Sequence, residues 1–183
     1  MIILASNSPR RKQLLSKIVP DYKIEVSKVE EVCPSHLKLK KVPVYLATLK
    51  ASDVYSRFPN DVVIGADTIV ISKHQMLGKP KDKKDIYRMI NMLQGTSHYV
   101  VTGVCIIKDN KKYTFSSITK VYFKKMSKEQ IEDYCNLETL YDKAGAYAIQ
   151  AEAKKYIHHI IGEYHNVMGL PICKLKKVLR KIV

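Results

Sequence analysis

The chain has 183 residues, of which 46% are apolar and 27% charged. This balance is typical of a globular protein and excludes a low-complexity chain, and the length predicts one domain over residues 1–183. No apolar run approaches the ~20 residues that span a bilayer.

The 32 Lys and Arg against 17 Asp and Glu give a net charge of +15. Such a charge attracts nucleotides, nucleic acid or an anionic membrane surface without choosing among them.

The four cysteines and the N-terminus indicate the compartment. Cys33, Cys105, Cys135 and Cys173 are far apart and form no CxxC pair, which favours reduced thiols over a metal site or a disulfide framework. The apolar run at residues 1–5 is too short for a signal peptide. We therefore expect a cytoplasmic protein with no membrane partner.

The first third of the chain alternates strands and helices. Residues 2–5 predict a short buried strand, and Pro9 then suits the first turn of a helix that continues to Ile18. Residues 22–26 alternate in polarity as a strand does, and residues 43–55 predict a second helix. The most strand-like run is 61–71, where β-branched residues dominate.

The remainder predicts further elements of both kinds, and alternating strands and helices indicate an α/β fold. Residues 143–173 mix glycines with short strands. The better-defined elements are a helix over 83–93, strands over 98–107 and 113–123 joined by a turn at Asp109-Asn110, a helix from an N-cap at Ser127 to about Leu137, and a terminal helix over 174–183.

Four polar segments can carry chemistry. Ser6 to Arg11 joins a strand to a helix, where backbone N–H groups, hydroxyls and guanidiniums suit a polyphosphate, although an ordinary N-cap explains the segment as well. Asp67 lies within an apolar strand, where an unpartnered carboxylate is costly, so it is a candidate catalytic or metal-binding group. Lys50 and Lys79 are candidate phosphate contacts, although an ordinary surface lysine is the alternative in a chain this rich in Lys. Gln150 both donates and accepts hydrogen bonds, as base recognition requires.

These segments, taken in order, resemble the signatures of the Maf family over nearly the whole chain. The matching segments are Leu4–Arg11, Leu46–Ala51, Gly65–Thr68, Gly78–Pro80, Thr102-Gly103, Lys143–Tyr147, Ile149-Gln150 and Asn166–Pro171. The resemblance implies a nucleoside triphosphate pyrophosphatase that requires a divalent metal, Mg²⁺ or Mn²⁺. It also implies an inosine-triphosphatase-like α/β fold, an elongated mixed sheet with flanking helices and a cleft between two lobes.

The family's functional residues fall on definite positions of this sequence. The resemblance implies that Asp67, Lys50 and Lys79 are catalytic and that Glu31 and Asp67 bind the metal. It implies a nucleoside triphosphate as the partner and leaves a homodimer open. The residues that it implies for substrate binding are Ser6, Ser8, Arg10, Arg11, Thr68 and Gln150.

Base preference and function class have alternatives. Arg10, Thr68 and Gln150 match the branch that favours dTTP and UTP, and the other branch favours 7-methyl-GTP. Ala148 and Ala151 replace usual glycines beside Gln150. A basic nucleic-acid-binding or cell-division regulatory protein is the alternative of a different class. We consider nucleic acid the less favoured partner, because lysines are spread along the chain and Trp is absent.

Overall fold

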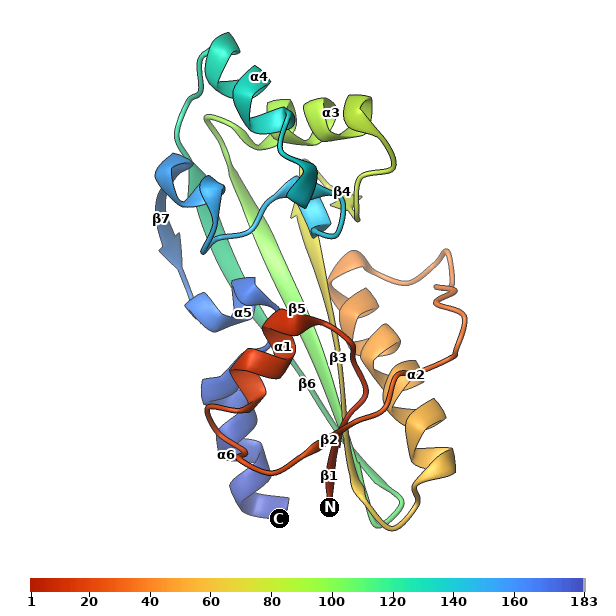
Figure 1. The fold of residues 1–183 in the computed structure, drawn as a ribbon. Coiled ribbons are helices and arrows are strands. Elements are labelled where there is room, and N and C mark those ends of the chain that lie inside the picture. Colours follow the sequence, from red (N-terminus) through yellow and green to blue (C-terminus); the bar gives the residue numbers. More distant parts are fainter. Residues whose placement is uncertain (183) are drawn as a thin grey trace. The chain divides into compact units, whose positions relative to one another are not determined.

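Seven strands form one sheet in the order β2-β1-β3-β5-β6-β7, with β4 paired to β3 (Figure 1). The computed structural model describes residues 1–182. β1 pairs in parallel with both β2 and β3, whereas β3–β4 and β6–β7 are antiparallel, so the sheet is mixed. The strands are β1 (Ile2–Leu4), β2 (Lys23–Ile24), β3 (Val62–Ser72), β4 (Gln75–Leu77), β5 (Ser97–Lys108), β6 (Lys111–Phe123) and β7 (Ile157–Ile161).

Six α-helices accompany the sheet in the described residues, and the predicted α/β class is confirmed. The predicted helix over 83–93 is confirmed to the residue, and the predicted N-cap at Ser127 is present, with Gln130 completing a capping box. The terminal helix begins two residues before Lys174, and Val183, its last predicted residue, lies outside the described residues. The helices are α1 (Pro9–Leu15), α2 (Val42–Arg57), α3 (Lys83–Leu93), α4 (Lys128–Cys135), α5 (Tyr164–Met168) and α6 (Ile172–Ile182).

Three details differ from the prediction. α1 ends at Leu15 instead of Ile18, and the hydroxyls of Ser16 and Tyr22 both donate to the carbonyl of Lys12. β2 has only two residues. β4 was not predicted, because the turn before it, at Lys73-His74, takes positive φ angles of 46° and 61° without the Gly or Asn that signals such a turn. The Asp109-Asn110 turn, by contrast, has positive φ at both residues and joins β5 to β6 as predicted.

The chain divides into two compact units. The first comprises residues 1–68, 102–117 and 169–182, and the second comprises 69–101 and 118–168. Both include parts of the three long strands β3, β5 and β6, and the single domain expected from the chain length stays a prediction. No helix in residues 1–182 is long and apolar enough to cross a membrane.

Each unit has its own buried core. In the first, α2 packs against β1, β3 and β5 through Ala47, Ala51 and Val54. In the second, α3 and α4 pack on one face of the sheet, where Val100, Val121 and Phe123 are buried. Burial of these apolar side chains is the main stabilising contribution in both units.

Candidate functional site

Asp67 lies on β3 at a point where helix α2 approaches the strand closely. Gly65 permits this approach, because a Cβ atom at Gly65 would lie only 2.3 Å from the carbonyl oxygen of Ala47 and 2.9 Å from the Cβ of Ala51. At Gly103 on β5 a Cβ would lie 2.2 Å from the backbone of Pro43 and Val44. Two glycines on two strands therefore seat α2 against the sheet and determine how far its side chains reach.

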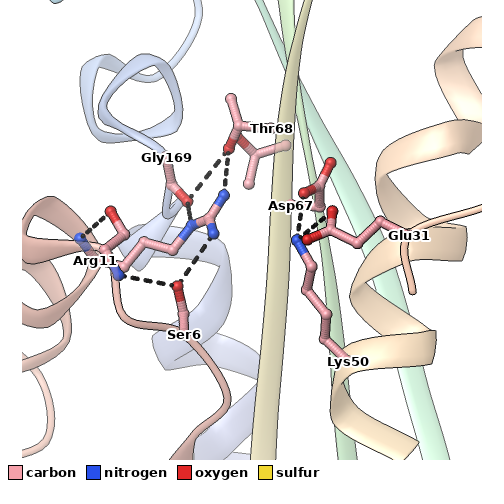
Figure 2. A network of polar contacts seen from close by, with 9 residues as sticks. Ser6, Arg11, Glu31, Lys50, Asp67, Thr68 and Gly169 are labelled. Atoms are coloured by element: carbon pink, nitrogen blue, oxygen red, sulfur yellow. Dashed lines mark hydrogen bonds and ion pairs between the residues drawn. The ribbon is translucent and has the colours of Figure 1, made fainter. Parts of the chain in front are cut away.

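Lys50 of α2 joins the two predicted metal-binding carboxylates. Its Nζ lies 2.7 Å from Oδ1 of Asp67 and 2.9 Å from Oε2 of Glu31 (Figure 2). The side chains of Lys50 and Asp67 are 13% and 12% exposed, whereas that of Glu31 is 51% exposed. One ammonium group thus bridges a buried carboxylate and an exposed one.

The surroundings of Asp67 make its carboxylate more basic than usual. Burial raises the pKa of Asp67, against the opposing charges of Lys50 and Arg11, and the negative charge of Glu31 adds to the increase. Loss of hydration disfavours the charged form of a carboxyl group, so its pKa rises. A carboxylate with a raised pKa accepts a proton more readily, which suits a general base.

Arg11 forms a second network on the other side of β3 (Figure 2). Its Nε donates to the carbonyl of Gly169 at 3.0 Å, and its terminal nitrogens donate to Ser6 Oγ at 3.2 Å and Thr68 Oγ1 at 3.1 Å. Asp67 and Thr68 are consecutive strand residues, and consecutive side chains of a strand point to opposite faces. The two networks therefore flank one strand.

This network occupies three of the five N–H donors of the Arg11 guanidinium and leaves two for a ligand. Burial lowers the pKa of Arg11, while the charge of Asp67 opposes the change. The sequence placed Gly169 in the segment Asn166–Pro171, which resembles a family signature, and gave it no contact with Arg11. Its contact with Arg11 could not be predicted, because every residue has a backbone carbonyl and the sequence does not show which one accepts a hydrogen bond.

The segment from Ser6 to Arg11 has the local structure of a helix N-terminus. Ser8 is the N-cap of α1, with a long bond of 3.5 Å from the Arg11 amide to its Oγ, and Ser6 Oγ accepts from the Ser8 amide at 3.3 Å. The ordinary N-cap considered from the sequence is thus present. It does not exclude phosphate binding, since hydroxyl oxygens accept and donate at once.

The carboxylates fit a hard divalent cation. Asp67 and Glu31 offer only oxygen donors, and both contact one point, the Nζ of Lys50, within 2.9 Å. Mg²⁺ and Mn²⁺ prefer oxygen ligands and are commonly bound by one or two carboxylates. These oxygen donors are chemically suited to Mg²⁺ or Mn²⁺, and the metal site itself stays a prediction.

Two predicted site residues, Lys79 and Gln150, belong to the second unit. Both side chains are exposed. The amide of Gly145 donates to the carbonyl of Gly78 at 3.0 Å, which ties the turn that carries Lys79 to the loop that leads to Gln150. Gly145 has a φ of 70° and packs against Val70, 3.1 Å from its ideal Cβ position, so a larger residue would be strained there.

Buried aromatic groups hold the same loop. Nε2 of His98 lies 2.7 Å from the hydroxyl of Tyr147, and the hydroxyl of Tyr134 donates to the carbonyl of Ala146 at 3.2 Å. Burial lowers the pKa of His98 to about 3, so this imidazole is neutral at physiological pH. The loop before Gln150 is therefore attached at three points, including the Gly145 bond.

The structure brings two groups of predicted residues together in the first unit. Glu31, Lys50 and Asp67 form one, and Ser6, Arg11 and Thr68 form the other. Ser8 caps the helix beside them, and Arg10 is half-buried in its first turn. Lys79 and Gln150 occupy one connected pair of loops in the second unit.

Comparisons with known proteins identify the family of the chain. Residues 1–182 match the family model described as Maf-like protein. A dTTP/UTP pyrophosphatase of Alkaliphilus metalliredigens is 45% identical over 183 aligned residues, which cover 98% of this chain and 95% of that protein. A dTTP/UTP pyrophosphatase of Pyrococcus furiosus is 41% identical, with 97% of this chain and 93% of that protein covered.

Two solved structures share the fold at low sequence identity. The Ham1 protein of Staphylococcus aureus has a TM-score of 0.56 and 17% identity, and the alignment covers 98% of both chains. A HAM1 protein of Coxiella burnetii has a TM-score of 0.53 and 12% identity over the same share of each chain. At these identities the likeness shows the fold alone.

Proposed function

The chain belongs to the Maf family, and we propose that it is a nucleoside triphosphate pyrophosphatase that releases a nucleoside monophosphate and pyrophosphate. The observation that carries this proposal is the convergence of Glu31 and Asp67 on Lys50 beside the Arg11 network. Carboxylates, an ammonium and a guanidinium around one strand are the groups that phosphoryl transfer needs. The names of the relatives support the same reaction.

The chemistry can be assigned to named side chains. Asp67 accepts the proton of the water that attacks the α-phosphorus, a role that its raised pKa favours. Negative charge then builds on the leaving pyrophosphate, and cations placed there lower the barrier. Lys50 and the two remaining donors of Arg11 supply this charge, and the family resemblance assigns a catalytic role to Lys79 as well. Ser6, Ser8 and Arg10 bind and orient the phosphates.

Glu31 and Asp67 would hold the divalent cation, which neutralises phosphate charge when it is bound. Lys50 already bonds both carboxylates, so it also keeps them close together without a metal. We expect activity to vanish in excess chelator and to return with Mg²⁺ or Mn²⁺. Glu31→Gln should raise the Mg²⁺ concentration that half-restores activity. Full activity in excess chelator would exclude this part of the proposal.

We propose dTTP and UTP as the preferred substrates, with Gln150 reading the base. Its amide carries an acceptor and donors that match the O4 and N3–H edge of thymine or uracil, and Arg10 and Thr68 contribute to the same preference. Once a bound base covers the Gln150 amide, a polar group left without its partner costs about 1–3 kcal/mol. One mismatched group therefore lowers kcat/KM by about 5- to 150-fold.

A substrate panel tests the reaction and the base separately. UTP, dTTP, GTP and 7-methyl-GTP are assayed with identification of the products. We expect monophosphate and pyrophosphate, with kcat/KM for UTP above that for both guanine nucleotides. Orthophosphate and a diphosphate as products would refute the reaction, whereas a preference for 7-methyl-GTP would place the protein in the other branch.

Gln150→Ala tests the residue assigned to the base. We expect the preference for UTP to collapse while hydrolysis persists. Gln75→Ala is the matched control, because Gln75 is an exposed glutamine of β4 in the same unit. A preference that survives Gln150→Ala would mean that the base is read elsewhere.

A further inference from the structure

One face of the sheet in the second unit carries exposed aromatic and apolar side chains. The opposite face is covered by α3 and α4, which pack on Val100, Val121 and Phe123. Side chains alternate along a strand, so Tyr99 of β5 and Tyr122 of β6 point away from those helices. Tyr99 is 38% exposed, Ile118 of β6 is 42% exposed and Ile161 of β7 is 60% exposed.

Strand pairing gathers these residues from distant parts of the chain. β6 and β7 are antiparallel, with Tyr122 opposite His159 and Lys120 opposite Ile161. We use the term aromatic face for the surface formed by Tyr99, Ile118, Lys120, Tyr122, His159 and Ile161. It includes none of the residues of the candidate active site. Three strands about 4.8 Å apart give it a width of roughly 10 Å.

The rings of the aromatic face are held together with a cation among them. Tyr122 and His159 stack with ring centroids 4.1 Å apart and planes inclined by 15°. Nζ of Lys120 lies 4.8 Å from the ring centroid of Tyr122 and 5.8 Å from that of Tyr99. A hydrogen bond with Tyr122 is the first cause of a raised pKa at Lys120, so this amine is charged at physiological pH.

Lysines border this face at one end, and Glu163 follows β7 at the other end. The sequences of β5, β6 and β7 contain no Asp or Glu. Lys124 and Lys125 follow β6 directly, and Lys154 and Lys155 precede β7. The ends of these strands meet, since Nζ of Lys124 donates to the carbonyl of Lys155 at 3.0 Å. The carboxylate of Glu152 lies 3.7 Å from Nζ of Lys155 and pairs with this lysine.

This combination selects an anionic partner with flat, apolar groups. Base–aromatic stacking beside a basic groove is how single-stranded nucleic acid binds without sequence preference. A duplex hides its bases within its own stack. A second copy of the chain would bring a lysine-bordered face of the same sign against this one, in a protein whose net charge is already +15.

We infer that the aromatic face of the second unit binds single-stranded nucleic acid, independently of nucleotide hydrolysis. Bases stack on the exposed rings of Tyr99 and His159, and half-buried Tyr122 supports His159 by stacking on it. Lys120 and the neighbouring lysines contact the phosphates. This activity lies beyond the proposed pyrophosphatase reaction and uses different side chains.

The test is fluorescence anisotropy with a labelled oligothymidylate of about 15 nucleotides, which suits the size of such sites. We expect saturable binding that weakens as salt is raised. A duplex of the same length should bind less tightly. Tyr99→Thr and Tyr122→Thr remove a ring but keep a residue that favours strands. Each should weaken binding by about 5- to 150-fold, the effect of losing one stacked base.

Tyr113→Thr is the matched control, because Tyr113 lies on the same strand β6 outside the aromatic face. We expect it to bind the oligonucleotide as the unsubstituted protein does, and all three variants to retain pyrophosphate release. Lys120→Gln should reduce the slope of log affinity against log salt by about 0.7, the change expected for one phosphate contact with a single strand.

Equal affinity in Tyr99→Thr, Tyr122→Thr and the unsubstituted protein would overturn the proposal, since net charge alone would then explain binding. A dimer that Tyr122→Thr converts to a monomer in sedimentation, with oligonucleotide binding unchanged, would assign the face to a second copy and would also overturn it. If Tyr122→Thr lowers the melting temperature, His159→Ala replaces it as the test, because His159 is exposed. Weaker oligonucleotide binding by His159→Ala supports the proposal, and unchanged affinity overturns it.

Discussion

Substitution of Gly65 by Ala tests whether the contact between α2 and β3 positions the catalytic groups. The added Cβ would lie 2.3 Å from the Ala47 carbonyl oxygen, whereas ordinary van der Waals contact begins at 3.4 Å. The helix therefore has to retreat by about 1 Å, and Lys50 is carried on that helix. Overpacking of this kind costs about 1–3 kcal/mol. For a chain of this length we expect the melting temperature to fall by about 2–12 °C.

The same movement should lower activity more than stability. Lys50 contacts Asp67 at 2.7 Å, and a displacement of about 1 Å at a catalytic group can reduce the rate about 100-fold. Pyrophosphate release and thermal unfolding are measured for Gly65→Ala and for the control Gly78→Ala, whose added Cβ meets no atom within 4 Å. The control should change stability by less than about 1 kcal/mol. A Gly65→Ala protein with unchanged kcat and melting temperature would refute this reasoning.

Two further substitutions test the two units separately. Asp67→Asn should abolish turnover while the melting temperature holds or rises at neutral pH. The raised pKa means that the ionised carboxylate is held at a cost, and this cost disappears as pH falls through that pKa. The stability that the variant gains over the unsubstituted protein should therefore shrink as pH falls toward 3.8, the ordinary pKa of Asp. A gain that grows as pH falls would contradict the assignment. Tyr147→Phe should lower stability by about 1–3 kcal/mol, because Nε2 of buried His98 loses its 2.7 Å partner. Thermal unfolding of Tyr147→Phe is compared with that of the control Tyr141→Phe, which alters an exposed tyrosine. Equal stability of the two variants would show that the hydrogen bond between His98 and Tyr147 contributes nothing.

Local signals predicted much of the fold because they depend on neighbouring residues. α3 repeats apolar residues at helical spacing, and these residues, Ile86, Met89, Ile90 and Leu93, are the buried ones. The Asp109-Asn110 turn has residues that tolerate positive φ. β4 escaped prediction because it has three residues and follows a Lys-His turn that lacks such a signal.

The candidate site could be predicted as a set of residues but not as an arrangement. Asp67 stands out in the sequence because a carboxylate within an apolar strand needs a partner. That its partner is Lys50 depends on the absence of a Cβ at Gly65, two residues before Asp67 on the facing strand. The contact of Arg11 with the carbonyl of Gly169 joins residues 158 positions apart, and nothing in either residue type announces it.

Scattered charge along a sequence does not decide whether a basic protein presents a binding surface. The lysines of this chain are spread through its length, and on that ground the sequence disfavoured nucleic acid as a partner. In the second unit, antiparallel pairing places Tyr122 opposite His159, and alternation along β5 and β6 directs Tyr99, Lys120 and Tyr122 to one face. Residues separated by up to sixty positions thus form one surface on which rings and a cation are in contact. In a sheet protein, a surface forms from residues that are neighbours across strands, not along the sequence. Such a surface can be recognised only when the order and register of the strands are known.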